Sequence, residues 1–297
     1  MRNSTGSAFA AAAISSMNDS AAKVDCGPFG SRRLPVRSGV SHTRGRLTTC
    51  VAVRVLGMTY MSDGVAELPA AGVARVVMLS TDKAARPGGV MGATKRFAEY
   101  LMAARNNPGG SPKLVSVRFG NVLASRGSVV PLFIAQIRAG GPVTVSHEEA
   151  TRYFMSLKEA CMLVIQASLM GEGGEIFILR MGEPIRIAEL ARDLIALSGL
   201  KAGSDIRVEF TGLRPGEKLH EALVAEGEET VASGHEHILR TASRVPERAA
   251  LDASLQTLEA LAASGDDDGI RAELARVIAD ASLAGASAAE PKSVRRR

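Results

Sequence analysis

The sequence predicts an α/β fold, in which a partial Rossmann-like parallel sheet is followed by a smaller C-terminal α/β substrate domain. Short apolar runs alternate with helical patterns between residues 51 and 245, as they do in βαβ units. A chain of 297 residues is long enough for about two domains. The composition, 46% hydrophobic and 23% charged, is typical of a globular protein.

Four segments of the sequence differ in composition and in hydrophobic periodicity. Residues 1–50 have neither a helical nor a strand period, which predicts an irregular or disordered leader. Residues 51–120 predict the remnant of a Rossmann domain, and residues 121–245 predict the second, ligand-binding part. Residues 246–297 are rich in alanine and polar residues, which predicts a helical tail with a disordered end.

Individual elements can be placed in chain order. Apolar runs predict strands at 75–79, 114–118, 143–145, 175–179 and 206–210, the last of which is the final strand expected. Helical spacing predicts helices at 92–106, 131–138, 157–170, 187–198 and 270–281. Pro131 suits a first helical turn, where its missing N–H has no cost, and Gly171 and Gly199 follow the ends of two helices.

Charge and cysteine content narrow the class of protein. The net charge of +5 sits largely in the irregular ends, and no patterned basic face is visible, so we expect an anionic small ligand and no nucleic acid. Cys26, Cys50 and Cys161 are an odd number without metal-ligand spacing, which favours a reducing cytoplasm. No apolar run approaches the roughly 20 residues of a membrane span. His235 and His237 lack further ligands at a suitable spacing, so no metal is predicted.

Polar residues directly follow the first buried strand. Ser80-Thr81-Asp82-Lys83 comes after residues 75–79, and ligands of open α/β sheets bind beyond the carboxyl ends of strands. A hydroxyl, a carboxylate and an amine in one place can donate and accept protons. The alternative is a solvated turn. Met91 and Lys95 then lie on one face of the next helix.

These residues resemble the short-chain dehydrogenase/reductase superfamily, whose Tyr-x-x-x-Lys motif here has Met91 in place of the tyrosine. Within that superfamily the chain resembles the polysaccharide-biosynthesis branch of the nucleotide-sugar 4,6-dehydratases, some members of which also carry this Met. The resemblance rests on four segments in order: Ser80-Thr81-Asp82-Lys83-Ala84 with Val90-Met91-Gly92-Ala93-Thr94-Lys95-Arg96; Arg118-Phe119-Gly120-Asn121-Val122-Leu123 with Gly127-Ser128-Val129-Val130-Pro131-Leu132-Phe133; Thr151-Arg152-Tyr153-Phe154-Met155; and Gly212-Leu213-Arg214-Pro215-Gly216-Glu217-Lys218.

The resemblance implies roles for the first segment. Asp82 would protonate the departing C6 hydroxyl, Lys83 would help to remove protons from the sugar, and Thr81 would bond the C4 oxygen. Lys95 would hold the nicotinamide ribose of NAD or NADP. Since Met91 cannot titrate, any base must come from elsewhere.

The later segments are implied to bind the substrate, a nucleotide-diphosphate sugar of the UDP-N-acetylhexosamine class. By resemblance, Asn121 and the loop with Ser128 cover the diphosphate, and Arg214 binds it from a turn set by Pro-Gly. The loop leads into a helix N-terminus, which favours phosphate. Arg152 and Glu217 are further candidates for contacts with the substrate.

One expected feature of the family does not occur. The chain contains no Gly-x-Gly-x-x-Gly, the motif that grips a dinucleotide pyrophosphate. A sheet without its neighbouring strands leaves an open edge, which a second copy or a partner chain would cover. The sequence therefore leaves three functions open: an active 4,6-dehydratase, a truncated nucleotide-sugar-binding domain without turnover, and a nucleotide-sugar epimerase of the same superfamily.

Overall fold

The computed structural model describes residues 73–125, 127–241 and 245–278. Its centre is a five-stranded sheet in the order β1-β2-β7-β11-β10. β1 (Arg75–Leu79), β2 (Lys113–Arg118) and β7 (Ile176–Leu179) run parallel, whereas β11 (Ile238–Thr241) and β10 (Thr230–His235) add an antiparallel hairpin. The predicted α/β fold and the three predicted parallel strands are confirmed.

The prediction that the last strand lies at 206–210 was wrong. β10 and β11 follow it in the chain, and β10 forms one end of the sheet order. The sequence of β10, Thr-Val-Ala-Ser-Gly-His, is mostly exposed and polar, so it lacks the alternation that marks a half-buried strand. The residues before it make β9 (Val208–Phe210), which pairs with β4 (Val143–Val145) outside the main sheet.

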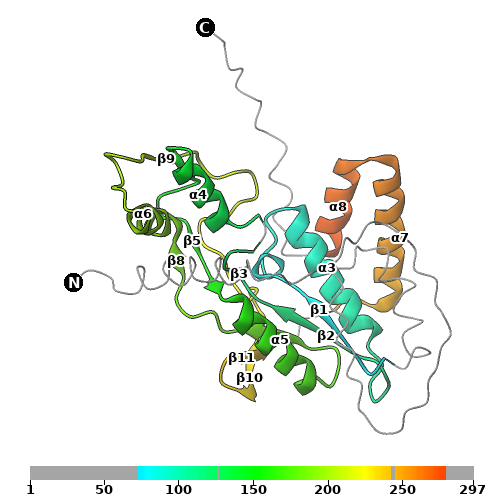
Figure 1. Cartoon of the computed structure of the whole chain (residues 1–297). Helices are drawn as coiled ribbons and strands as arrows, with labels where there is room; N and C mark the ends of the chain where they lie inside the picture. The colour runs from blue at the N-terminus through cyan, green and yellow to red at the C-terminus, as the bar shows by residue number, and fades with distance from the viewer. Residues whose placement is uncertain (1–72, 126, 242–244, 279–297) are drawn as a thin grey trace, which may run out of the picture.

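Helices cover both faces of the main sheet (Figure 1). On one face α3 (Val90–Arg105) packs with α7 (Arg248–Ser264) and α8 (Asp267–Val277), around a core that includes Phe97 and Leu255. On the other face α5 (Leu157–Met170) packs around Phe177. Because both faces are covered, the parallel strands are largely apolar on both sides instead of alternating, with polar residues at Arg75, Lys113, Ser116 and Arg118.

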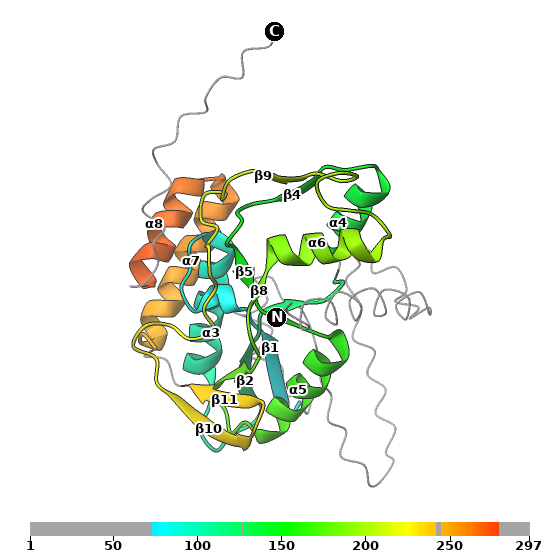
Figure 2. The same cartoon turned by 90° about the vertical axis from the view of Figure 1, so that its left-hand side faces the viewer.

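A second lobe stands beside the end of the sheet (Figure 2). It contains α4 (Val129–Arg138), α6 (Ile187–Leu197), β4 and β9, and it has its own core around Phe133 and Leu194. Two short sheets connect the lobes, one of β3 (Asn121–Val122) with β6 (Phe154–Met155), the other of β5 (Thr151–Arg152) with β8 (Ile185–Arg186). The main sheet draws strands from both sides of residue 120, since β7, β10 and β11 all come from the segment 121–245.

Several helix boundaries differ from the expected ones. α4 begins at Val129, two residues before Pro131, so the proline lies within the first turn, where its missing N–H is still harmless. α8 begins at Asp267, because the Asp266 side chain caps it by accepting a hydrogen bond from Gly269 N at 2.8 Å. The predicted leader at 1–50 lies outside the described residues.

Candidate active site

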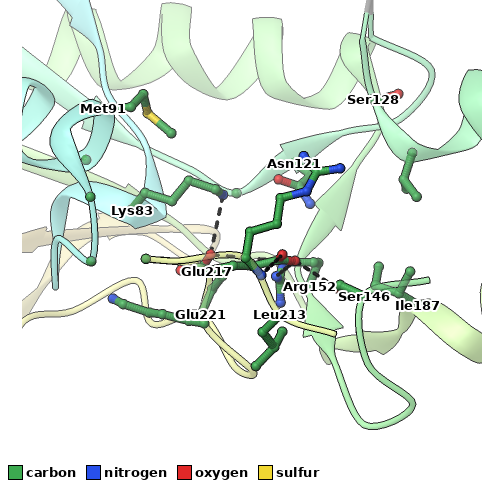
Figure 3. Close-up of a pocket in the computed structure, with 18 of the residues that line it drawn as sticks. Lys83, Met91, Asn121, Ser128, Ser146, Arg152, Ile187, Leu213, Glu217 and Glu221 are labelled. Carbon is green, nitrogen blue, oxygen red and sulfur yellow. Dashed lines mark hydrogen bonds and ion pairs between the residues drawn. The ribbon is translucent and has the colours of Figure 1, made fainter. Parts of the chain in front are cut away.

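A cavity of about 1230 Å³ opens between the carboxyl end of the main sheet and the second lobe. Figure 3 shows side chains from both sides converging on it. Three segments supply most of its lining: the start of α3, the passage from β3 into α4, and the turn that follows β9. Of the residues predicted from the sequence, the cavity brings together Lys83, Met91, Asn121, Ser128, Arg152, Arg214 and Glu217.

Lys83 enters the cavity from a single 3-10 turn, η2 (Asp82–Ala84), directly after β1. Its Nζ donates to Oδ1 of Asp82 at 2.9 Å, and Oγ1 of Thr81 donates to the same oxygen at 2.8 Å. Asp82 is fully buried, and its Oδ2 has no hydrogen-bond partner among the described residues. Thr81 and Asp82 therefore lie behind Lys83, which forms the cavity wall.

Met91 and Lys95 lie one turn apart on α3. Met91 is 56% exposed and lines the cavity, whereas Lys95 does not line it. Nζ of Lys95 donates to the carbonyl oxygen of Leu79 at 3.2 Å, at the end of β1. Burial lowers the pKa of the Lys95 amine below its usual value, and the Glu99 carboxylate opposes that shift.

Glu221 is a cavity residue that the sequence did not indicate. Its side chain is 5% exposed, and Oε1 lies 3.8 Å from Nζ of Lys83 and 3.9 Å from Nε of Arg152. Figure 3 shows Lys83 reaching across the cavity toward the side that carries Glu217 and Glu221. Glu221 belongs to no regular element, so no periodicity marked it; its one signal was its position three residues beyond the Gly-Leu-Arg-Pro-Gly-Glu-Lys segment.

Arg152 and Glu217 hold each other in place. The buried Arg152 guanidinium donates to the carbonyl oxygens of Thr151 at 2.7 Å and Leu219 at 3.1 Å, and to Oε1 of Glu217 at 3.0 Å. Glu217 also accepts from Oγ of Ser146 at 2.8 Å. Both predicted residues lie in the cavity wall, but most of their polar atoms are already engaged by the protein.

Arg214 and the start of α4 have free hydrogen-bonding groups. The Arg214 side chain makes no hydrogen bond or ion pair with any described residue, while its backbone N–H donates to Oε2 of Glu217 at 3.2 Å. Ser128 is the N-cap of α4 but makes no capping bond, and its buried Oγ is unpaired within the described chain. An arginine and an uncapped helix N-terminus on one cavity suit an anion.

Two glycines bring the opposite sides of the cavity into contact. A Cβ on Gly88, just before α3, would lie 2.7 Å from the carbonyl oxygen of Gly216, so a larger residue would force the segments apart. Nearby, Nζ of Lys218 donates to the carbonyl oxygen of Arg86. Burial lowers the pKa of the Lys218 amine, and the charges of Arg86 and Lys83 lower it further, although Glu221 opposes them.

A buried network of ion pairs and hydrogen bonds connects the elements that carry one wall of the cavity. Arg118, at the end of β2, donates to Glu99 at 2.9 and 2.7 Å and to Glu228 at 2.7 Å. Ser80 donates to Glu99 at 2.5 Å, and Arg96 pairs with both carboxylates. Burial would lower the pKa of Arg118, but the two carboxylates outweigh it and raise that pKa. The network thus joins the ends of β1 and β2 to α3 and to the segment around Glu228.

The charge of the cavity wall favours an anionic ligand. Five cationic side chains line it, against the two carboxylates of Glu217 and Glu221: Lys83, Arg86, Arg152, Arg214 and Lys218. In the described ranges no group of three or more His, Cys, Asp or Glu side chains could hold a metal ion. No helix in the same ranges is both long and apolar enough to cross a membrane.

These features define a class: an α/β protein with a cationic ligand cleft beyond the carboxyl ends of its parallel strands. Residues 42–243 match the family described as Polysaccharide biosynthesis protein, and the chain belongs to this family. The predicted family resemblance is therefore confirmed.

Individual relatives agree with the family. Over 168 residues the chain is 54% identical to the capsular polysaccharide biosynthesis protein CapD of Staphylococcus aureus, covering 57% of this chain and 28% of the relative. It is 43% identical over 155 residues to a UDP-glucose 4-epimerase of Rickettsia canadensis, covering 52% of this chain and 44% of the epimerase. The X-ray structure of Pen from Bacillus thuringiensis matches with a TM-score of 0.56 and 34% identity, over 63% of this chain and 58% of Pen. The chain spans less than half the length of these two sequence relatives.

Proposed function

We propose that this chain contains the acid–base residues and the substrate site of an NAD(P)-dependent nucleotide-sugar 4,6-dehydratase that acts on a UDP-N-acetylhexosamine during glycan precursor synthesis. The observation that carries the proposal is the Lys83 amine, which enters a cationic cavity while bonded to a buried carboxylate at 2.9 Å. The cavity, about 1230 Å³, has room for a ligand larger than a simple sugar.

The reaction needs a base and an acid close together. A C5 proton leaves toward the base, the C5–H electron pair forms the C5–C6 double bond, and the C6 hydroxyl departs with a proton from the acid. Lys83 faces the cavity and acts as the base, whereas the acid role that the family resemblance gives to Asp82 falls on a carboxyl buried directly behind Lys83 and bonded to it at 2.9 Å. Proton transfer within their hydrogen bond restores the reactive forms, neutral amine and neutral acid, after each turnover. Met91 lines the cavity without titrating.

The diphosphate would bind on the other side of the cavity. Arg214 has a guanidinium without a partner among the described residues, and a planar fork of donors suits phosphate oxygens. Ser128 and the first N–H groups of α4 face the same space, with Asn121 beside them. Arg152 and Glu217 shape this wall through their mutual ion pair at 3.0 Å.

NAD(P), when bound, supplies reversible hydride acceptance at the C4 position of the sugar. By resemblance Lys95 would hold the nicotinamide ribose, and in this structure its amine is bonded to the carbonyl oxygen of Leu79 at 3.2 Å. The whole sequence contains no Gly-x-Gly-x-x-Gly, so no pyrophosphate contact is assigned to this chain.

Turnover and binding test the proposal together. The purified chain with NAD(P) and UDP-N-acetylglucosamine should form a 4-keto-6-deoxy product, detected by mass spectrometry as the loss of one water. Lys83→Met should lower kcat by roughly 100-fold or more, because the base is removed, while UDP still binds in calorimetry. UDP binding without any keto product, at every NAD(P) concentration tried, would sink the dehydratase assignment.

Two further functions have support of their own. The identity of 43% to a UDP-glucose 4-epimerase favours an epimerase, whose product would keep its C6 hydroxyl. A nucleotide-sugar-binding domain without turnover, which would bind UDP but not NAD(P), also fits a sequence that contains no Gly-x-Gly-x-x-Gly. Product analysis separates the first from the dehydratase, and calorimetry with NAD(P) separates the second. The cytoplasmic location and the covering of the sheet edge by another chain stay predictions.

A further inference from the structure

We propose that Glu221 is the positioning residue of the Lys83 base: its carboxylate orients the amine and stabilises the ammonium that forms when Lys83 takes a proton. The inference rests on the proposed function, since it assigns a partner to the base of that reaction. The sequence motifs did not mark Glu221; its position in the fold does.

Burial makes Glu221 an unusual side chain. It is 5% exposed, and Oε2 has no hydrogen-bond partner among the described residues. A buried carboxylate is costly unless cations compensate it. Lys83 at 3.8 Å and Arg152 at 3.9 Å do so, one from each side of the cavity. Arg152 is itself fixed by three hydrogen bonds, so Glu221 has a rigid support on the side away from Lys83.

Lys83 therefore lies between two carboxylates with different tasks. Asp82 accepts its hydrogen bond at 2.9 Å and, as the acid, must lose a proton when the C6 hydroxyl departs. Glu221 lies 3.8 Å from Lys83 and 3.9 Å from Arg152 and takes no part in the proton transfers. As Lys83 gains the C5 proton it becomes positive, and the fixed negative charge of Glu221 favours that change. The arrangement has the logic of a catalytic triad, in which a carboxylate orients the base and stabilises its cation.

Other charges face the same amine. Lys218 lies near Lys83 and Glu221, and its positive charge opposes protonation of Lys83. Asp82 and Glu221 favour it. Removing the Glu221 charge leaves Lys83 between one carboxylate and the ammonium of Lys218, so the uncharged amine should persist to lower pH.

The first test does not depend on turnover. The full chain is treated with trace acetic anhydride over a pH series, and acetylation of Lys83 is measured by peptide mass spectrometry relative to the exposed Lys201. In Glu221→Gln the pH at which Lys83 is half labelled should fall by roughly one unit. Glu226→Gln is the matched control, because Glu226 is 85% exposed and does not line the cavity, although it pairs at 3.6 Å with Arg86, which does. Equal labelling curves in the two variants would overturn the proposal.

The second test uses the reaction. Glu221→Gln should lower kcat roughly 100-fold with KM changed less than about threefold, because the charge acts on the base and not on substrate affinity. Glu221→Asp, which retains the charge, should recover part of kcat. A loss confined to KM would overturn the positioning role. If the wild-type chain binds UDP but makes no keto sugar, the proposed function fails, while a shifted labelling curve would still show that Glu221 controls the charge of Lys83.

Discussion

On one side of the cavity, Ser80, Glu99 and Arg118 join in a buried network in which every charge faces an opposite charge. On the other side, the turn at 211–218 is largely exposed, and its Arg214 guanidinium meets no partner among the described residues. Both sides carry several charged side chains. Those of the buried network form ion pairs with one another, whereas the Arg214 side chain on the exposed turn does not pair with any described residue. The difference separates charges that stabilise the fold from charges that are available to a ligand.

The pairing has a physical reason. The proposed roles of Lys83 and Asp82 require a fixed geometry, and paired buried ions with specific hydrogen bonds fix geometry strictly. The exposed side must exchange water for a ligand, which a guanidinium already satisfied by the protein does poorly. Arg152 lies on the same side of the cavity as Arg214, but its guanidinium is already engaged by the protein, because it donates to Thr151, Leu219 and Glu217.

The largest effect should follow from breaking the buried network. Arg118→Leu leaves Glu99 and Glu228 with less compensation in a buried place, and should lower the free energy of unfolding by about 3–5 kcal/mol. Denaturant unfolding measures it. Arg271→Leu removes an exposed ion pair with Asp268, at 2.8 Å, and should cost less than about 1 kcal/mol. Similar midpoints for the two variants would refute the claim that the network stabilises the sheet side.

A change at Arg214 should affect binding and leave stability intact. Arg214→Ala removes the proposed charged donor to the diphosphate and should weaken UDP binding by about 1.5–3 kcal/mol, or roughly 10- to 150-fold, in calorimetry. Its unfolding midpoint should not move, since no described residue loses a partner. Arg207→Ala, at a 77% exposed position outside the cavity, is the control and should bind UDP as the wild type does. An Arg214→Ala variant with unchanged affinity would remove Arg214 from the site.

The contact between the two sides can be tested with a pair of glycines. Gly216 and Gly212 both have positive φ, 78° and 83°, so alanine costs about 1–2 kcal/mol at either position. At Gly216 a Cβ would also collide with the carbonyl oxygen of Gly88, whereas at Gly212 it meets nothing within 4 Å. For each variant, the loss in free energy of unfolding and the loss in free energy of UDP binding are added. This sum should be about 1–3 kcal/mol larger for Gly216→Ala than for Gly212→Ala. Identical losses would mean that the two sides need not touch.

The smallest effect concerns pH. The pKa of Lys218 is lowered in the folded chain, first by burial, so its charged form opposes folding below that pKa. The opposition is fully present at neutral pH and disappears as pH rises toward the unfolded value of about 10.4. Lys218→Met should thus raise the melting temperature at neutral pH, by an amount that shrinks as the solution becomes more alkaline. A gain that is constant with pH would indicate better packing instead of a removed charge.

The buried strands of this molecule could be predicted from the sequence, because the hydrophobic pattern that marks them lies within a few consecutive residues. Buried parallel strands such as β1 and β2 are largely apolar, and the polar residues that follow β1 mark the edge of the sheet where ligands bind in open α/β folds. β10 could not be predicted in this way, because an exposed strand at the end of the sheet order shows no apolar alternation and depends on its neighbour for its shape.

Lys83, Met91, Asn121 and Arg214 carry motif information, so the sequence by itself predicted that they belong to one site, and all four line one cavity. Only the tertiary structure decided how they are used. It separated the engaged guanidinium of Arg152 from the free one of Arg214, and it placed Glu221 at 3.8 Å from Lys83. The physical reason is that the protonation and availability of a charged group depend on burial and on charges a few ångströms away, which come from chain segments far apart in sequence.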